Sequence, residues 1–470
     1  MEEVIVLYPN AGRGHLDSMV ELGKLIINHY PSLLVTVVIS GPPHEIPTTL
    51  TYTQAVSATT PSITFLQLPT VTPPPITSFT EETIISQFFE IAVLNNSNLH
   101  NALLNVSKTS KIKALVLDLF CASAFEVSTS LNIPTYFFYT SGASGLCMLL
   151  HWPTLVNDTT RDFKAPNTTI NIPGVPPIPS EKFPLSAVDR SSKVFRYFEE
   201  VGLQMTKSAG IIVNTFDLLE QRALEAARGG KCTSDGSSPP IYCLGPIVKI
   251  TEDKAEHDCL TWLESQPSNS VLFLCFGSGG VFSAKQTREI AIGLESSGVR
   301  FLWVVRDPLP EDGVQSNPTS LESFLPDGFM ERTKTRGFIV KSWAPQAAIL
   351  NHGSVGGLVT HCGWNSILEA VCAGVPMLAW PLYAEQHLNR VLLVEELKVA
   401  LPVNESENRF VSAHELEMKV RELQNSETGK CLRDKVAILR KEALMATNNG
   451  GSSRVALAKL VESFRNGFSN

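Results

Sequence analysis

The sequence predicts an α/β protein made of two doubly wound domains in tandem. Its 470 residues are too many for one ordinary core, at roughly 100–200 residues per domain. Hydrophobic residues make up 43% of the chain and charged residues 18%, which is enough apolar material for packed cores. Short β-rich runs alternate throughout with stretches long enough for helices. Strands joined by helical crossovers favour parallel sheets that are buried on both faces.

The first series of elements begins with a strand over Val4–Tyr8, which leads through a glycine-containing loop at 10–14 into a helical pattern over Leu16–Ile26. Five further β-rich runs follow, at 33–40, 63–69, 114–120, 134–139 and 210–216. This alternation predicts the first doubly wound domain.

A Pro/Gly/Ser-rich stretch at 235–250 breaks the periodicity and predicts a linker. The pattern then restarts with a strand at 271–276 and a glycine loop at 277–280. Ser283 and Gln286 have the spacing of a capping box that opens a helix ending at Ser297. Four more strands are expected, at 301–305, 337–341, 355–360 and 375–381. Two such domains place a ligand crevice at the carboxyl ends of both sets of strands.

Composition argues against several classes of partner and compartment. The net charge is −8 and the pI about 5.8, without a dense Lys/Arg run, so nucleic acid is not an expected partner. The first ten residues carry two acids and no basic n-region, and no run approaches the ~20 apolar residues of a membrane span. Nine cysteines without a C-x-x-C pair indicate reduced thiols in a cytoplasmic protein rather than a zinc site.

One segment combines a buried strand with a helix start that suits an anion. The strand at 355–360 runs into a short loop, after which Asn365 or Ser366 begins a helix ending near Ala373. A helix N-terminus after a glycine-containing loop favours a diphosphate. Alternatively, Ser366 and Glu369 form an ordinary capping box without any ligand. Taken singly, a histidine or tryptophan in this segment is more often structural than functional.

The stretch Trp343–Gln386 contains the motifs W-A-P-Q at 343–346, H-C-G-W-N-S at 361–366 and a closing Glu-Gln pair. It resembles the signature box of the plant family of UDP-dependent secondary-product glycosyltransferases. The resemblance extends to the amino-terminal histidine loop, the F-G-S loop and the helical tail, and so covers nearly the whole chain. It implies two Rossmann-like domains facing a cleft (GT-B type), and an enzyme that transfers a sugar from a UDP-sugar to a small acceptor without a metal or other cofactor.

The resemblance assigns residues to every part of the sugar nucleotide. It implies that Trp343 stacks on uracil, that the backbone of Ala344 contacts the uracil edge, and that Gln346 and Glu369 bind the ribose hydroxyls. It also implies that the diphosphate is bound by Ser278, His361, Asn365 and Ser366, and the sugar hydroxyls by Thr140, Trp364, Glu385 and Gln386. These roles suit the groups, because an indole face offers stacking area and a carboxylate accepts two vicinal hydroxyls.

His15 follows the first strand, and Asp118 closes the strand at 114–120, so both are expected at carboxyl ends of parallel strands. The resemblance implies that His15 is the general base and Asp118 its orienting acid. The alternative for Asp118 is a loop-capping acid. Phe120, Cys121 and Tyr383 are expected to give an aromatic acceptor an apolar wall.

The expected reaction is an inverting transfer of glucose that forms a β-O-glucoside. Trp364, Glu385 and Gln386 have the family's glucose-type arrangement, without the arginine that glucuronosyl-transferring relatives often carry. The amino-acid sequence as a whole resembles the branch of the family that glucosylates chalcones, flavones and isoflavones. This resemblance indicates a flavonoid-type phenol as the acceptor. Transfer to a ring carbon and transfer to a non-flavonoid phenol or a terpenoid remain open.

Two other functions compete with this interpretation. A dinucleotide-dependent oxidoreductase would carry G-x-G-x-x-G, but Asp17 and Phe282 stand where the third glycine belongs in the two candidate loops. A sugar-nucleotide sensor without catalysis would not need both His15 and Asp118.

The expected division is an acceptor domain at 1–245, a donor domain at 246–451 and a final helix at 452–470. Val455, Leu457, Leu460, Val461 and Phe464 lie largely on one helical face, which must be buried. The resemblance implies that this helix packs on the first domain, whereas the alternative is a cap on the second. The protein is expected to be a monomer.

Overall fold

The structure is a computed structural model that describes residues 1–41, 46–75, 80–158, 163, 165, 168–183, 185–249, 257–308, 320–406 and 408–466. The chain divides into two compact units. The amino-terminal unit comprises Met1–Lys249 together with Met445–Asn470, and the carboxyl-terminal unit comprises Ile250–Leu444. Of the predicted elements, part of the linker at 235–250 and the end of the tail at 467–470 lie outside the described residues.

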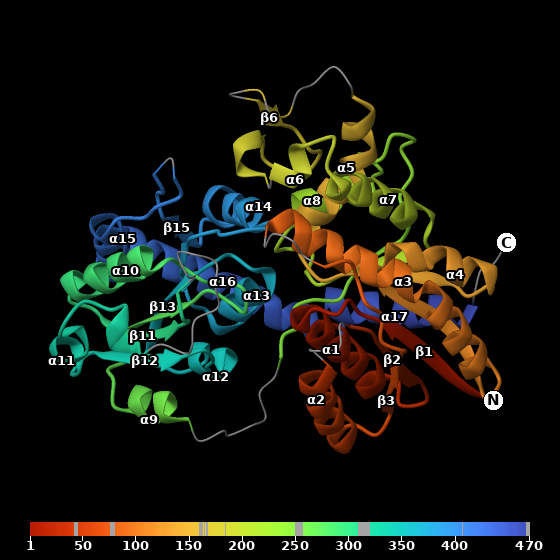
Figure 1. Ribbon diagram of the computed structural model, residues 1–470, viewed down its shortest axis with the longest axis horizontal. Helices are drawn as coiled ribbons and strands as arrows, with labels where there is room; N and C mark the ends of the chain where they lie inside the picture. The colour runs from red at the N-terminus through yellow and green to blue at the C-terminus, as the bar shows by residue number, and fades with distance from the viewer. Residues whose placement is uncertain are drawn as a thin grey trace. The chain divides into compact units, whose positions relative to one another are not determined.

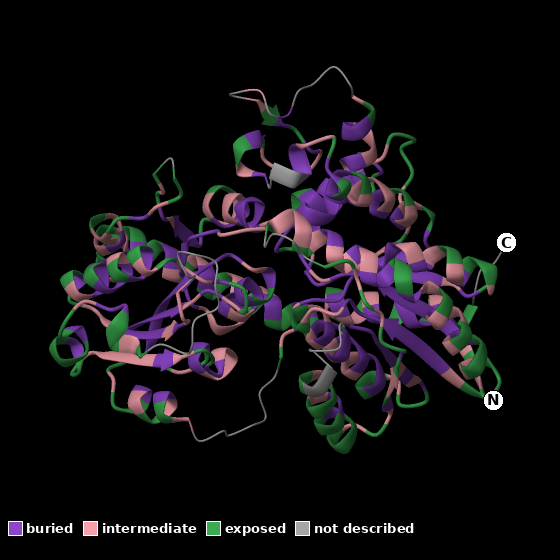
Figure 2. Cartoon of the chain, in the orientation of Figure 1, coloured by how far each residue is buried: buried purple, intermediate pink, exposed green. Residues whose placement is uncertain are grey.

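The amino-terminal unit is built on a parallel sheet with the strand order β3-β2-β1-β4-β5-β8-β9. Figure 1 labels its strands β1, β2 and β3. Its strands are β1 (Glu2–Tyr8), β2 (Leu34–Ile39), β3 (Ile63–Gln67), β4 (Ser110–Asp118), β5 (Thr135–Tyr139), β8 (Gly210–Val213) and β9 (Ile241–Cys243). A separate antiparallel pair is formed by β6 (Thr169–Ile170) and β7 (Ile178–Pro179). The strands are largely buried, as the purple segments of Figure 2 show.

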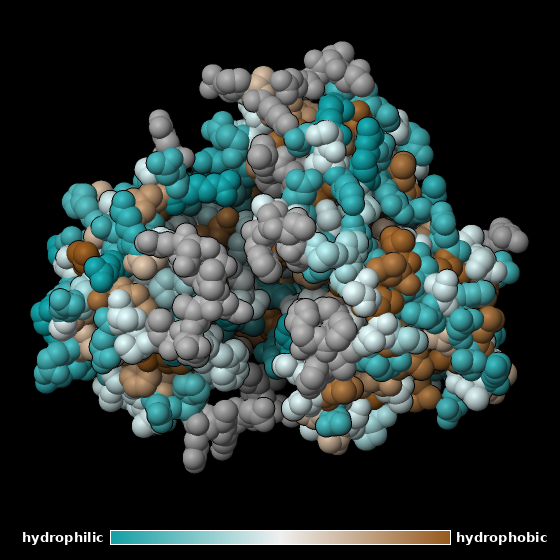
Figure 3. All heavy atoms as spheres, in the orientation of Figure 1, coloured by the Kyte–Doolittle hydropathy of each residue, from teal (hydrophilic) through white to brown (hydrophobic). Residues whose placement is uncertain are grey.

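Helices connect these strands and supply the rest of the core. They are α1 (Arg13–His29), α2 (Ile46–Thr59), α3 (Glu81–Ser107), η1 (Leu119–Ala124), α4 (Phe125–Ser130), α5 (Ala143–Asn157), η2 (Ser180–Lys182), α6 (Leu185–Val188), α7 (Lys193–Lys207), α8 (Gln221–Arg228) and α17 (Ser452–Asn466). Several apolar side chains stay exposed, including Val93 and Leu94 of α3. On the face drawn in Figure 3, apolar residues are interspersed with hydrophilic ones, which is normal for a protein surface.

The final helix, α17, packs on the amino-terminal sheet. Leu457, Leu460, Val461 and Phe464 join the core cluster that contains β1 and β2 residues. Polar contacts also hold the helix: Ser463 accepts from the Tyr136 hydroxyl at 2.9 Å, and the Arg465 carbonyl accepts from Lys113 Nζ at 3.0 Å. The expectation that Val455 shares the buried stripe is wrong, since its side chain is 43% exposed. Val455 precedes Leu457 by two positions, which turns it to the opposite side of the helix.

The carboxyl-terminal unit has a second parallel sheet, with the order β12-β11-β10-β13-β14-β15. Its strands are β10 (Val271–Cys275), β11 (Arg300–Val305), β12 (Gly337–Lys341), β13 (Val355–Thr360), β14 (Met377–Ala379) and β15 (Ala400–Pro402). Its helices are α9 (Asp258–Glu264), α10 (Ala284–Ser297), η3 (Leu321–Ser323), α11 (Phe329–Thr333), α12 (Gln346–Leu350), α13 (Trp364–Ala373), α14 (Gln386–Val391), the π-helix η4 (Leu392–Glu396), α15 (Ala413–Asn425) and α16 (Glu427–Thr447).

The start of α10 differs in one respect from the predicted capping box. Ser283 Oγ accepts from the Gln286 N–H at 3.2 Å, as expected of an N-cap. The Gln286 side chain does not return to Ser283; it bonds the backbone N–H and C=O of Val411 at 2.9 and 2.8 Å. The Gln286 side chain therefore holds the segment that precedes α15.

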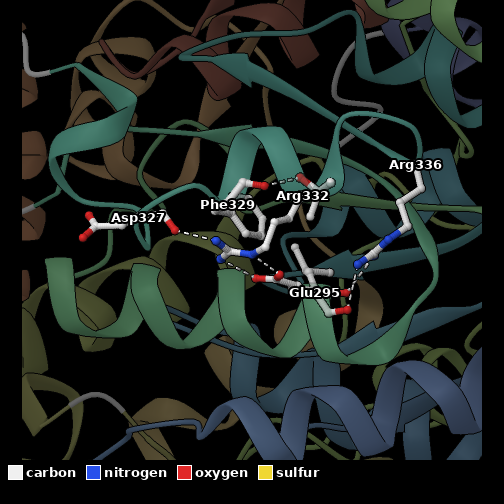
Figure 4. Close-up of polar contacts among 7 residues, drawn as sticks. Glu295, Asp327, Phe329, Arg332 and Arg336 are labelled. Carbon is white, nitrogen blue, oxygen red and sulfur yellow. Dashed lines mark hydrogen bonds and ion pairs between the residues drawn. The ribbon is translucent and has the colours of Figure 1, made fainter.

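Two arginines secure the other end of α10, as Figure 4 shows. Arg332 of α11 makes a two-pronged ion pair with Glu295, with its Nε 2.5 Å from Oε1 and its Nη2 3.0 Å from Oε2. Arg336 donates to the carbonyls of Leu294, Glu295 and Val299. Cations suit this end because the last carbonyls of a helix lack backbone partners and carry partial negative charge.

The sequence predicts the fold class correctly, and the structure shows where each sheet can bind a ligand. In both sheets the strand order reverses beside the first strand, at β1/β4 in the amino-terminal unit and at β10/β13 in the carboxyl-terminal unit. Loops at the carboxyl ends of two such strands diverge and leave room for a ligand. The expected linker at 235–250 is wrong in part, because Ile241–Cys243 pairs with β8 as an edge strand.

Candidate active site

His15 and Asp118 meet at the switch point of the amino-terminal sheet. His15 lies in the first turn of α1 rather than in the preceding loop, and Asp118 ends β4. The distance between His15 Nδ1 and Asp118 Oδ2 is 2.7 Å. The carboxylate is fully buried, whereas the imidazole side chain keeps 25% of its surface exposed. The pair therefore joins a buried carboxylate to a partly exposed imidazole.

Asp118 makes the contacts that both of the predicted alternatives require. Its Oδ1 accepts the Phe120 N–H at 3.0 Å and caps the short helix η1, while its Oδ2 faces His15. Because a carboxylate only accepts, the imidazole donates from Nδ1 and keeps its lone pair on Nε2. The cap fixes the carboxylate, and the carboxylate fixes the tautomer.

Aromatic residues and one hydroxyl surround this histidine. The Phe120 ring meets the imidazole edge to face, with centroids 5.3 Å apart, and Phe88 of α3 lies 5.3 Å from Phe120. Thr140, the first residue after β5, places its Oγ1 3.5 Å from His15 Nδ1. The sequence did not predict a role for Phe88, because the periodicity of a helix does not show which strand end that helix lies beside. The predicted Cys121 is buried, and it offers an acceptor no accessible wall.

In the carboxyl-terminal unit, Gln346 joins two residues of α13. Its Nε2 lies 3.0 Å from Ser366 Oγ and 2.6 Å from Glu369 Oε2. The alternative of a capping box is wrong, because α13 begins at Trp364 with Gly363 as its N-cap and without a side-chain cap. Instead of capping the helix, Ser366 and Glu369 both contact Gln346. These three polar residues, all predicted to contact the nucleotide, therefore lie together at the first turns of α13.

His361 lies between the two glycine loops at the switch point of this sheet. A methyl group on Gly277, which follows β10, would lie 2.6 Å from His361 Nε2, and one on Gly363 would also collide with the ring. Burial lowers the pKa of His361 to about 4, so the imidazole is neutral at physiological pH. Its Nδ1 is buried and has no hydrogen-bond partner within the described residues. A neutral ring can donate one hydrogen bond to an anion.

The remaining predicted donor residues differ in exposure. Trp343 is 65% exposed, which leaves its indole available for stacking, while the neighbouring Ala344 and the helix-starting Trp364 are buried. Ser278 is exposed in the loop after β10, and Asn365 is exposed in the first turn of α13.

The closing loop before α14 is held by its own glutamine. Gln386 is buried, and its Oε1 accepts from the N–H groups of Leu382 and Tyr383 at 2.9 and 3.0 Å. Glu385 is partly exposed. The Tyr383 side chain packs in the same unit, where a methyl group on Gly279 would lie 2.6 Å from its hydroxyl. Its contact with an acceptor stays a prediction.

Comparisons with known proteins decide the family. The family described as "UDP-glucoronosyl and UDP-glucosyl transferase" matches residues 244–439. The chain is 51% identical to UDP-glycosyltransferase 88B1 of Stevia rebaudiana and 49% identical to the anthocyanidin 5,3-O-glucosyltransferase of a Rosa hybrid cultivar, with 98% of each chain covered in both alignments. The chain belongs to the UDP-glycosyltransferases.

A solved structure matches this UDP-glycosyltransferase over its whole length. It is Phytolacca americana UGT2 complexed with UDP-2fluoro-glucose and pterostilbene, at a TM-score of 0.87 and 35% identity, with 98% of this chain and 100% of that chain covered. The fold is therefore the GT-B type. Within the described part of this UDP-glycosyltransferase, no helix has the length and hydropathy of a bilayer span, and no three His, Cys, Asp or Glu residues are grouped as metal ligands.

The close packing of Gly277 on His361 gives a testable prediction for the UDP-glycosyltransferase. Gly277 has a φ of +72°, and Gly277→Ala would add left-handed strain of about 1–2 kcal/mol as well as the collision with the ring. We expect UDP affinity, measured by calorimetry, to fall at least about tenfold. Gly298→Ala is the matched control, since Gly298 has a φ of +73° and nothing within 4 Å of an added methyl group. Equal affinity losses in the two variants would contradict a specific role for the loop contact.

Proposed function

We propose that this enzyme transfers glucose from UDP-glucose to a phenolic hydroxyl of a flavonoid-type acceptor, with inversion, to give a β-O-glucoside. The single observation that carries the proposal is the His15–Asp118 pair, with a partly exposed imidazole beside Phe120 and Phe88. A flat phenol suits this place, because the aromatic rings offer apolar area and the imidazole accepts the phenolic proton.

In the proposed step, His15 Nε2 takes the proton from the acceptor hydroxyl as that oxygen forms a bond to C1 of glucose. The bond between C1 and the UDP oxygen breaks, and UDP leaves with the electron pair. The Asp118 carboxylate, which faces Nδ1, stabilises the imidazolium that forms, as the acid of a histidine pair does. Attack on the face opposite UDP inverts C1 and yields the β-glycoside.

The UDP part of the donor is proposed to lie along the loops of the carboxyl-terminal unit. The contacts with uracil and ribose are assigned to Trp343, Ala344, Gln346 and Glu369. Those with the diphosphate are assigned to Ser278, His361, Asn365 and Ser366, and those with the sugar to Thr140, Trp364, Glu385 and Gln386. Three observations support the assignment: the exposed indole of Trp343, the Gln346–Glu369 contact, and the buried His361 Nδ1, which has no hydrogen-bond partner among the residues that the structure describes.

No metal or other cofactor enters the proposed step. The departing diphosphate is stabilised by the N-terminus of α13, whose backbone dipole carries partial positive charge. We expect turnover of UDP-glucose to persist in excess chelator, followed as UDP release. The control repeats the assay with added Mg²⁺ and Mn²⁺. An activity that vanishes with chelator and returns with either cation would refute the metal-independent step.

Glucose is proposed as the sugar because Trp364 is buried at the start of α13, where a glucuronate carboxylate would need a cation. Comparable turnover of UDP-glucuronate would contradict this choice.

The acceptor class rests on the aromatic surroundings of His15 and on the relatives, one of which is named for an anthocyanidin and one of which was solved with pterostilbene. A panel of flavonoids, chalcones, simple phenols and terpenoids with UDP-glucose tests it. Preferred turnover of terpenoids would refute a flavonoid-type acceptor. Acid-resistant products would reveal transfer to carbon, because a C-glucoside lacks the hydrolysable bond.

A cytoplasmic location is proposed on the nine cysteines, which are all free thiols in the structure. The monomeric state stays a prediction, which sedimentation velocity can test.

A further inference from the structure

A buried carboxylate holds the start of α5, far along the chain from that helix. The N-cap residue, Gly142, supplies no side-chain acceptor. Glu220 takes this role, with its Oε2 accepting the Ala143 N–H at 2.7 Å and its Oε1 accepting the Ser144 N–H at 2.9 Å. Both oxygens are thus used on two successive amides of the first turn. Charge-assisted bonds to orphan helix amides are stronger than neutral ones.

Glu220 is well hidden, with 1% of its surface exposed. Burial raises the pKa of its carboxyl group, and the bonds from Ser144 and Ala143 oppose that rise. A carboxylate in such a place is costly unless its partners are fixed. The amide bonds from α5 and the side chains of Thr215 and Ser144 together compensate the desolvation.

The loop that this contact anchors carries Thr140. Only residues 140–142 separate the end of β5 from the start of α5, so both ends of the loop are pinned within a few residues. One end is held by β5, which pairs with β4 and β8, and the other by Glu220. Gly145 in the first turn packs so tightly on the Tyr139 hydroxyl that an added methyl group would collide with it. Thr140 therefore has little freedom beside His15.

The segment that bears Glu220 has a second attachment. Asn214, which follows β8, accepts the Ile247 N–H at 2.7 Å and donates to the Ile247 carbonyl at 3.0 Å. Thr215 accepts the Gly245 N–H at 2.8 Å through its carbonyl. The start of segment 214–220 is consequently fixed to the edge of the sheet. This attachment holds Glu220 in place beside the start of α5.

We propose that Glu220 is a positioning residue of the transfer reaction, which holds Thr140 at the distance from His15 that the reaction requires. This inference rests on the proposed function, because Thr140 and His15 are assigned there to the sugar and the acceptor. Glu220 itself touches neither substrate. It acts through the loop 140–142.

The test begins with Glu220→Gln, which keeps the size of the side chain but leaves one of the two amides without an acceptor. We expect kcat to fall about 10–10²-fold, the usual cost of misplacing a reacting group by a fraction of an ångström to 1 Å. The affinity for UDP, whose proposed contacts lie in the carboxyl-terminal unit, should not change. Glu289→Gln is the control: Glu289 Oε2 accepts the Ala413 N–H at 2.6 Å at the start of α15, in the carboxyl-terminal unit.

The double variant Glu220→Gln/Thr140→Val separates positioning from a general loss of structure. If Glu220 acts through Thr140, its substitution should lower kcat much less in the Thr140→Val background than in the wild-type enzyme. An equal fall in both backgrounds would overturn the proposal.

Hydrogen exchange provides a readout that does not depend on catalysis. Glu220→Gln should raise amide exchange at 140–146, while Glu289→Gln should not. If the wild-type chain fails to turn over UDP-glucose, the proposed function fails, but exchange at 140–146 still decides whether Glu220 holds the loop. Unchanged exchange there would overturn the inference.

Discussion

His15→Ala is expected to lower kcat about 10²–10⁴-fold, because the phenolic proton then has no acceptor near the reacting oxygen. The His15 ring is the exposed member of its pair, and Asp118 is fully buried, so no carboxylate takes its place. UDP binding should be unaffected, since its proposed contacts lie in the other unit. Initial rates of UDP release with a flavonoid acceptor give the measurement.

His29→Ala is the matched control for this variant. His29 is the last residue of α1, the helix whose first turn holds His15, and its side chain is exposed. Its removal should leave kcat within a small factor of the wild-type value. If His15→Ala loses less than about tenfold, His15 is not the general base.

Asp118→Asn should be nearly as severe, with an expected loss of about 10²–10⁴-fold in kcat. The amide oxygen can still cap the Phe120 N–H, so the local fold is retained. The amide NH₂ then faces His15 Nδ1, which must accept, and the ring proton moves to Nε2. The base is lost although every residue around it is in place.

Circular dichroism and thermal unfolding of Asp118→Asn should match the wild type closely. Asp118→Ala removes the cap as well and should unfold at a lower temperature, which distinguishes the two roles of this carboxylate. Retention of more than a tenth of the wild-type kcat in Asp118→Asn would show that tautomer control is dispensable.

Much of the fold could be predicted from the sequence, because long buried strands appear as continuous runs of apolar and β-branched residues. The expected strands at 337–341 and 355–360 coincide with β12 and β13. The three-residue strands β9 and β15 were not expected, since such short runs give no period. β9 also follows a proline-rich stretch, which favours a linker in any local interpretation.

The amino-terminal site was predictable in outline, because the carboxyl ends of neighbouring parallel strands lie together. This placed His15 and Asp118 at one edge, where the structure has them 2.7 Å apart. Long-range partners could not be deduced in this way. Phe88 reaches the site from a helix, and Glu220 caps a helix that begins 77 residues earlier. No local pattern encodes either contact.

Ser366 and Glu369 show why a motif can suit two structures equally. Their spacing is that of a capping box, but the helix starts two residues before Ser366, and Gln346 bonds both side chains. A shift of the N-cap from Ser366 to Gly363, three residues earlier, converts a local cap into a set of polar side chains joined by Gln346.

The return of α17 to the amino-terminal sheet has a consequence for engineering by recombination. The amino-terminal unit is not a contiguous piece of the gene, because Met445–Asn470 belongs to it. A chimera joined only near residue 249 would pair one parent's sheet with another parent's Leu457, Leu460 and Phe464, and these side chains are buried in that sheet's core. Exchanges of acceptor specificity between relatives should therefore use two crossover points and transfer the tail together with the first unit.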